Sequence, residues 1–183
     1  MRVKGGELFL GKFKTSALVR KFGTPLYAYE AETIRRQYLK LAKNVPYKKL
    51  DIHYACKANT NVYILKLIRA LGAKAETVSR GEIELALKAG FKPKDIIYTS
   101  TSVSREELSF VVKNNISVNL DSLSQIELYG KMNKGGKVGI RINQGIGAGH
   151  HSHVITGGEM SKFGIPIEHL GQAQKLAKKH KLK

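Results

Sequence analysis

The residue whose type and position most clearly suggest chemistry is Lys57, in the stretch HYACKANTN over residues 53–61. This lysine closes a mostly apolar, β-prone run, and the small polar residues after it are typical of the turn that follows a strand. Alternation along such a strand places His53, Ala55 and Lys57 on one face of the sheet. An amine inside a fold is costly unless it is paired, neutral or covalently linked. Two interpretations follow: a solvated lysine in a lysine-rich chain, or a functional amine.

Three neighbouring histidines, His150, His151 and His153, form a second group that could bind a ligand. Their spacing matches no structural zinc pattern, and no cysteine or acidic ligand flanks them. We therefore expect no metal site, and the simplest role for a loop histidine here is local hydrogen bonding.

The elements that must position these side chains recur along the chain. Five short β-prone runs follow one another at a spacing close to 21 residues, which is roughly one strand, one helix and two short loops. They begin at Asp51, Lys74, Asp95, Ser117 and Lys137. Strands and helices alternating at a fixed spacing predict parallel strands joined by right-handed crossovers.

The intervening helices have clear start signals, because a serine is followed three residues later by Glu or Gln, as in a capping box. The three pairs are Ser79 with Glu82, Ser104 with Glu107, and Ser122 with Gln125. Before the first strand, Ile34, Tyr38 and Leu41 share one face of a further helix. Each strand is thus expected to lead into an amphipathic helix.

Two α/β folds fit this alternation, an open doubly wound sheet and a closed (β/α)8 TIM-type barrel. The even period, and the lack of a glycine fingerprint after the first strand, favour the barrel. A closed barrel needs eight strands, but only five are recognised, and residues 167–183 have the pattern of the helix after the fifth. We therefore expect a partial, truncated barrel of about five β/α units, with Lys57 at the carboxyl end of the first strand, where both folds place catalytic groups.

Composition narrows the class of protein. Hydrophobic residues make up 42% of the 183 residues and charged residues 25%, as in an ordinary globular chain. No apolar run approaches the length of a membrane span or of a secretory signal, and the one cysteine suits a reducing cytoplasm. The net charge of +18 raises the possibility of nucleic-acid binding, but the lysines are dispersed and no nucleic-acid-binding signature is present. We expect no specific nucleic acid and no membrane among the partners.

Several ordered motifs carry a resemblance to a known family. YACKANTN resembles the cofactor-lysine segment of pyridoxal-phosphate enzymes with the alanine racemase-like barrel. FGTPLYAYEAETIR, GAKAETVSRGEIELALKAGF, VNLDSLSQIEL, VGIRIN and HSHVITGGEMSKFGIP resemble, in order, segments of the diaminopimelate decarboxylase family. The likeness covers almost the whole chain. It implies a carboxy-lyase of lysine biosynthesis that converts meso-2,6-diaminopimelate to L-lysine with pyridoxal 5′-phosphate.

The resemblance also implies roles for single residues. Lys57 is expected to hold the cofactor covalently and to act as the catalytic lysine, with Glu76, Arg141 and His151 as further cofactor-site residues. Glu82 matches an acidic family residue, although its place in the capping box explains it equally well. Because an unpaired arginine inside a barrel is costly, we expect a carboxylate partner for Arg141, either Glu82 or Glu76.

Compared with the family pattern, the chain is expected to be incomplete. Residues 1–30 are expected to join a β-domain that the chain lacks, and residues 31–183 to form an incomplete pyridoxal-phosphate-binding barrel. Full-length members are homodimers that act on an amino-acid substrate, whereas this chain alone is expected to be inactive or nearly so. Three alternatives remain open: a decarboxylase of the same fold acting on carboxynorspermidine, arginine or ornithine, a non-catalytic pyridoxal-phosphate-binding barrel, and a basic nucleic-acid-binding module.

Overall fold

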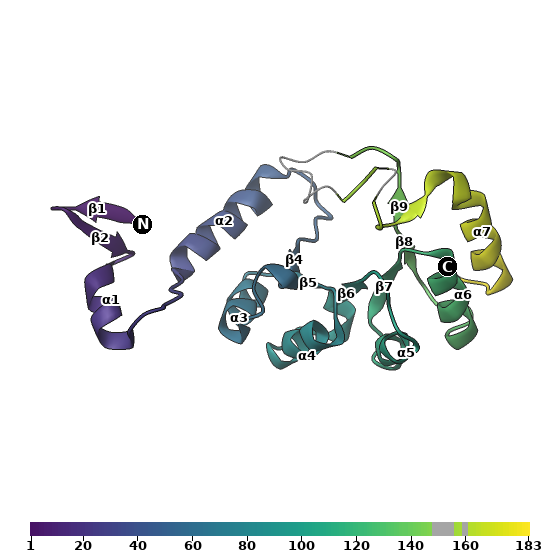
Figure 1. Ribbon diagram of the computed structural model, residues 1–183, viewed down its shortest axis with the longest axis horizontal. Helices are drawn as coiled ribbons and strands as arrows, with labels where there is room; N and C mark the ends of the chain where they lie inside the picture. The colour runs from purple at the N-terminus through teal and green to yellow at the C-terminus, as the bar shows by residue number, and fades with distance from the viewer. Residues whose placement is uncertain (148–155, 159–160) are drawn as a thin grey trace.

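The structure is a computed structural model, and it describes residues 1–147, 156–158 and 161–183. Its main feature is a five-stranded parallel sheet in the order β4-β5-β6-β7-β8 (Figure 1). The strands are β4 (His53–Ala55), β5 (Lys74–Thr77), β6 (Ile96–Thr99), β7 (Ser117–Leu120) and β8 (Gly139–Ile140). The spatial order equals the chain order, as the repeat predicted.

Helices follow the strands in turn and lie along one side of the curved sheet (Figure 1). They are α3 (Val62–Ala70), α4 (Arg80–Lys88), α5 (Arg105–Lys113) and α6 (Leu123–Met132), with α7 (Leu170–Lys179) beside α6 and the short 3-10 turns η2 (Pro93–Asp95) and η4 (Ile167–His169) in the connections. A doubly wound sheet would have helices on both faces, so this arrangement confirms a partial barrel.

Alternate residues of each strand face these helices and form the core. Ala75 and Thr77 of β5, Tyr98 of β6 and Leu120 of β7 are all buried on that convex face. The register makes Thr77 the Cα partner of Tyr98, so this row runs across neighbouring strands. The other set of alternate residues lies on the concave face, which five strands leave open because they do not close into a barrel.

The serine caps form as expected, but only one box is complete. Ser104 Oγ accepts the Glu107 backbone N–H at 3.1 Å, and Glu107 Oε2 accepts the Ser104 backbone N–H at 3.1 Å. Ser79 Oγ accepts the N–H of Glu82 at 3.2 Å, yet Glu82 Oε2 accepts from Val78, the residue before the cap, at 2.9 Å. The Glu82 side chain thus accepts a hydrogen bond from Val78, just after β5, instead of from the N-cap residue Ser79.

The fifth strand was expected to be continuous from Lys137, and that expectation was wrong. It is divided into β8 and β9 (Ile142–Asn143), with Arg141 between them. The Arg141 N–H donates to Leu120 O at 2.9 Å, whereas its carbonyl accepts from Ile165 at 2.8 Å. The backbone therefore changes partner at Arg141, from β7 to the parallel strand β10 (Ile165–Pro166).

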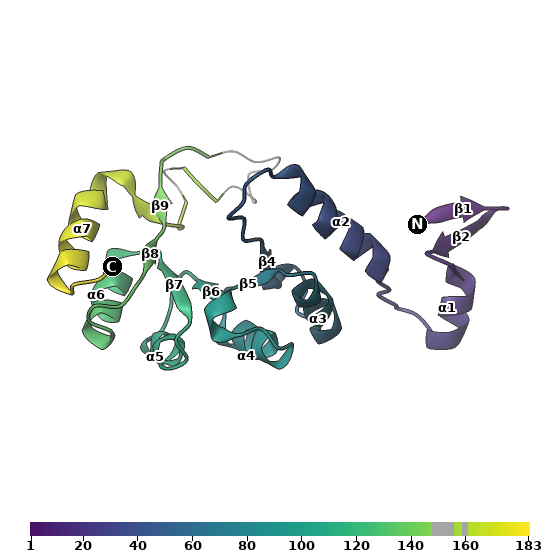
Figure 2. The ribbon, with the colours of Figure 1, turned by 180° about the vertical axis from the view of Figure 1, so that it is seen from behind.

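The N-terminal strands and α1 (Thr15–Phe22) lie at one end of the molecule, and α2 (Ala31–Asn44) lies between them and the sheet, with Ile34 and Tyr38 packed against Ile64 and Ile68 of α3 (Figure 2). A three-stranded antiparallel sheet, β1 (Arg2–Lys4), β2 (Glu7–Leu10) and β3 (Phe13–Lys14), leads into α1 and then α2. None of these elements contains a buried residue. Within the part of the chain that the structure describes, no helix is long and apolar enough to cross a bilayer.

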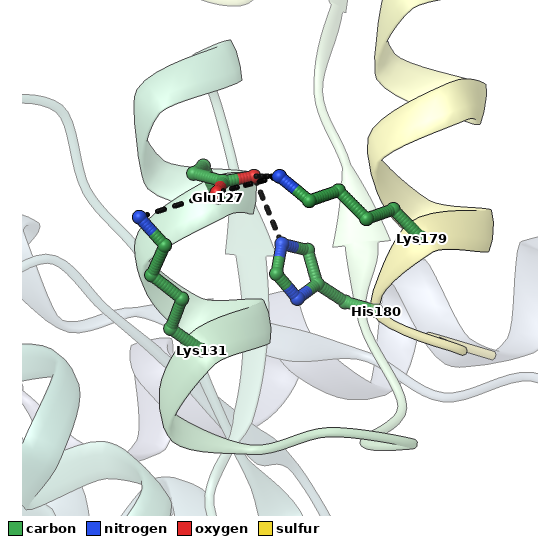
Figure 3. Close-up of polar contacts among 4 residues, drawn as sticks. All are labelled: Glu127, Lys131, Lys179 and His180. Carbon is green, nitrogen blue, oxygen red and sulfur yellow. Dashed lines mark hydrogen bonds and ion pairs between the residues drawn. The ribbon is translucent and has the colours of Figure 1, made fainter.

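The last helix is attached by a polar cluster on α6, shown in Figure 3. The Glu127 carboxylate lies 2.8 Å from Nε2 of the buried His180, 3.0 Å from Lys179 Nζ and 3.2 Å from Lys131 Nζ. The hydrogen bond from His180, followed by those from the two lysines, lowers the pKa of Glu127 to about 2. Gly130 leaves room for the imidazole, because a Cβ there would lie 2.3 Å from His180 Cγ.

Candidate active site

Lys57 lies just past the carboxyl end of β4, in the 3-10 turn η1 (Cys56–Ala58). The strand ends two residues earlier than alternation suggested, and the Lys57 side chain is exposed. Lys57 lies at the open end of the sheet in the described residues. Lys57 has no hydrogen bond or ion pair with any residue in the described ranges, so its amine is free to react.

The small polar residues after Lys57 have a structural role. Asn61 is the N-cap of α3, where its side chain accepts the Tyr63 N–H at 2.9 Å, and Asn59 Oδ1 accepts the Asn61 N–H at the same distance. Tyr54 Oη donates to the Asn59 carbonyl at 3.2 Å. Together these bonds tie the turn that carries Lys57 to the strand before it and the helix after it.

Cys56, the neighbour of Lys57, is fully buried on the helix side. Burial, with smaller contributions from the charges of Glu82 and Glu76, raises the pKa of its thiol to about 12. The thiol stays protonated and shielded at neutral pH, so it does not compete with Lys57 as a nucleophile.

Glu76 lies on the concave face beside the strand that precedes the lysine. The register makes it the Cα partner of Ala55 on one side and of Ile97 on the other. Its side chain is half-buried. A carboxylate next to the lysine-bearing strand is where the resemblance expects it, and its role stays a prediction.

Further polar side chains lie on the concave face, at the carboxyl ends of β6 and β7. The sequence motifs did not identify these residues. Asn119 Nδ2 donates to Thr99 Oγ1 at 3.0 Å, and Thr101 Oγ1 donates to Asp121 at 2.9 Å. Gly139 provides the space for the amide, since a Cβ there would lie 2.0 Å from Asn119 Oδ1. Strand parity could have identified Thr99 and Asn119, because they share a face with Glu76.

Arg141 lies at the opposite edge of the sheet from Lys57, four strand spacings away, or about 19 Å along the curved sheet. Its guanidinium carbon lies 4.6 Å from the centroid of the Phe163 ring. The expected pairing with Glu82 or Glu76 is wrong: Glu82 binds the Val78 N–H, and no carboxylate in the described ranges forms an ion pair with Arg141. Among the described residues, an aromatic ring and no carboxylate lies against the cation.

Phe163 reaches Arg141 because Gly164 lets two backbones approach closely. Gly164 has φ +80°, and a Cβ on it would lie 3.0 Å from the Asn143 backbone nitrogen and 3.3 Å from the Arg141 carbonyl oxygen. Ser161 fixes the same turn, accepting the Phe163 N–H at 3.3 Å and donating to the Thr156 carbonyl at 2.9 Å. The segment Ser161–Gly164 is thus the support of Arg141.

His151 lies outside the described residues, as do His150 and His153. Within the described ranges, no group of three or more His, Cys, Asp or Glu side chains is placed to hold a metal ion. Lys162 is exposed, with its amine 5.4 Å from the centroid of the Phe163 ring.

Comparison with known proteins gives a consistent result. Residues 31–183 match the family described as pyridoxal-dependent decarboxylase, pyridoxal binding domain. The diaminopimelate decarboxylase of Methanothermobacter thermautotrophicus is 40% identical over 163 residues, which cover 87% of this chain and 38% of that protein. The diaminopimelate decarboxylase of Escherichia coli K12 is 38% identical over 170 residues, which cover 90% of this chain and 39% of that protein.

Solved structures agree with these relatives. The diaminopimelate decarboxylase of Helicobacter pylori in complex with L-lysine superposes with a TM-score of 0.85 at 32% identity, over 92% of this chain and 44% of that one. A lysine/ornithine decarboxylase of Vibrio vulnificus is only 20% identical with a TM-score of 0.76, so it supports the fold alone. The chain therefore spans about two fifths of the length of the relatives it matches.

Proposed function

The chain belongs to the pyridoxal-dependent decarboxylase family, and from that premise we propose that it is the lysine-bearing part of a diaminopimelate decarboxylase. In this proposal the reaction is the decarboxylation of meso-2,6-diaminopimelate to L-lysine, with pyridoxal 5′-phosphate bound at Lys57. The observation that carries it is an exposed lysine amine, unpaired within the described residues, just past the carboxyl end of the first barrel strand, in a chain that is 40% and 38% identical to two diaminopimelate decarboxylases.

The residues present fit the cofactor. An aldehyde needs an uncharged primary amine that no carboxylate holds, and Lys57 has no such partner within the described residues. When bound, pyridoxal phosphate supplies the electron sink into which the electrons of the broken carbon–carboxylate bond pass. Lys57 holds the cofactor in place, and η1, tied to Asn59 and Asn61, fixes the direction from which its amine approaches.

Further contacts are assigned on the same basis. We place Glu76 beside the cofactor because it neighbours the lysine strand on the concave face. Arg141 and His151 are proposed as further cofactor-site residues from the resemblance alone. Glu82 is not included, because its carboxylate caps the strand end at Val78.

The rest of the proposal concerns the whole protein. We propose that residues 1–30 join a second, β-rich domain, that the complete protein is a homodimer acting on an amino-acid substrate, and that it works in the cytoplasm. The N-terminal sheet and α1 support the first point, because they carry exposed apolar side chains such as Phe13 and Phe22 and bury none.

The proposal is tested with a chimera, in which this chain replaces the matching 39% of the Escherichia coli relative. A folded chimera is expected to release CO₂ from meso-2,6-diaminopimelate, and the Lys57→Ala chimera is expected to release none. The matched control is Lys66→Ala, which removes another exposed lysine, on α3, and should leave turnover unchanged. Turnover of ornithine, arginine or carboxynorspermidine instead of diaminopimelate would refute the proposed substrate.

A further inference from the structure

Arg80 and Arg141 lie at the same distance from a phenylalanine ring, but they differ in their charged partners. Arg80 lies 4.6 Å from the Phe110 centroid and Arg141 lies 4.6 Å from the Phe163 centroid. Arg80 Nε also donates to the Glu84 carboxylate at 2.8 Å. Arg141 has no carboxylate within the described ranges.

Stacking occupies only the face of a guanidinium. The N–H groups lie in its plane and remain available at the edge, which is how Arg80 satisfies a ring and a carboxylate together. At Arg141 the Phe163 ring lies against the guanidinium, and no carboxylate of the described residues takes up its N–H groups. The side chain is half-buried, so it differs from a freely solvated surface cation.

Arg141 is one of the residues that line a mainly polar cavity of about 340 Å³, together with Ile142, Asn143, Gln144, Ile146, Thr156, Gly157 and Phe163. This volume is within the range of small-molecule sites. Asn143 also lines the cavity, but its side-chain amide is already hydrogen-bonded within the protein. It donates to the Gly158 carbonyl at 2.9 Å and accepts the Gly145 N–H at 3.0 Å. Arg141 is the only charged residue in this lining set of described residues.

We infer that Arg141 binds a carboxylate of an amino-acid ligand, which takes the position that Glu84 takes at Arg80, and that Phe163 is the positioning residue that holds the guanidinium for it. The identity of the ligand as the substrate rests on the proposed function. The role of Phe163 rests on the stack and on the close approach at Gly164.

The test follows the arginine Nε–H signals by NMR in the 183-residue chain without cofactor, titrated at fixed ionic strength so that general screening stays constant. The probe is meso-2,6-diaminopimelate. Cadaverine, which has the same two amines and no carboxylate, is the first control, and inorganic phosphate is the second. Arg141→Lys and Arg80→Lys assign the two signals.

Diaminopimelate is expected to shift the Arg141 signal saturably, while cadaverine leaves it unmoved and the Arg80 signal does not respond. Loss of the ring in Phe163→Leu should weaken binding about two- to fivefold, the equivalent of one exposed cation–π contact, and Phe163→Tyr should retain it. Phe110→Leu is the matched control and should leave the affinity unchanged.

An Arg141 signal that ignores diaminopimelate, or that responds only to phosphate, overturns the inference. If Phe163→Leu folds and binds diaminopimelate with unchanged affinity, Phe163 does not position Arg141. If Phe163→Leu does not fold, loss of binding in Phe163→Tyr refutes the positioning role. Because the readout is an arginine signal in cofactor-free protein, its failure is distinct from a failure of cofactor attachment at Lys57.

Discussion

The close approach at Gly164 permits a sharp test of how the support of Arg141 is built. We consider Gly164→Ala with Gly145→Ala as its control, because the two glycines have similar dihedrals, φ +80° and +75°. A Cβ at Gly145 meets nothing within 4 Å, whereas one at Gly164 lies 3.0 Å from the Asn143 nitrogen and 3.1 Å from the Ile142 carbonyl carbon. Comparison of the variants therefore separates backbone strain from the clash.

Both variants carry the cost of an L-residue in a left-handed conformation, about 1 kcal/mol. Gly164→Ala must also push two backbones apart, which costs about 1 kcal/mol as overpacking. The same displacement stretches the 2.8 Å bond from the Ile165 N–H to the Arg141 carbonyl, worth about 1 kcal/mol. The free energy of unfolding should thus fall by about 3 kcal/mol in Gly164→Ala and about 1 kcal/mol in Gly145→Ala.

The assay is equilibrium urea unfolding of both variants and the parent chain, with the m-value compared to exclude a change of the unfolded state. The prediction is an excess loss of about 2 kcal/mol for Gly164→Ala over Gly145→Ala. Equal losses in the two variants would contradict the reasoning, because they would show that the neighbouring backbone yields at no cost.

Three further predictions concern the attachment of the last helix and the buried thiol. Gly130→Ala should lower the free energy of unfolding by about 2 kcal/mol and expose the amides of α7 to hydrogen exchange, because the new methyl group takes the place of the His180 ring; full protection of α7 would contradict this. The pKa of Glu127 falls from 4.5 to about 2, so its stabilising contribution is present above pH 4.5 and is lost as the pH falls towards 2. The free energy of unfolding should therefore fall less between pH 4.5 and pH 2 in Glu127→Gln than in the parent chain. The same fall in both proteins would contradict this prediction. Cys56, with its pKa near 12, should resist thiol reagents at pH 8 until urea unfolds the chain, and rapid labelling of the native chain would contradict its burial.

The sequence predicted the repeating architecture because each local signal acts over a few residues. Period and β-propensity located the five parallel strands, and the serines located the starts of α4, α5 and α6. The capping geometry was less predictable: Glu82 serves Val78 instead of Ser79, and this depends on how the preceding strand ends. A sequence pattern alone does not contain that information.

The candidate site was predictable in part. Lys57 was found by its position near the end of a strand, but its exposure depends on the three-dimensional arrangement around η1, which the sequence pattern does not contain. The partner of Arg141 was predicted wrongly, since charge balance suggested a carboxylate and the chain uses an aromatic ring 22 residues later in the sequence. Such a contact depends on the turn at Gly164, whose tight approach is visible only in three dimensions.

The central claim is that Lys57 is the amine that holds pyridoxal phosphate, and one measurement tests it most directly. The chain is incubated with the cofactor, reduced with borohydride, digested, and the tagged peptide is identified by mass spectrometry. We expect a single dominant tag on Lys57, although the chain contains 24 lysines, and its loss in Lys57→Arg. A tag distributed over other lysines, or absent from folded protein, would contradict it.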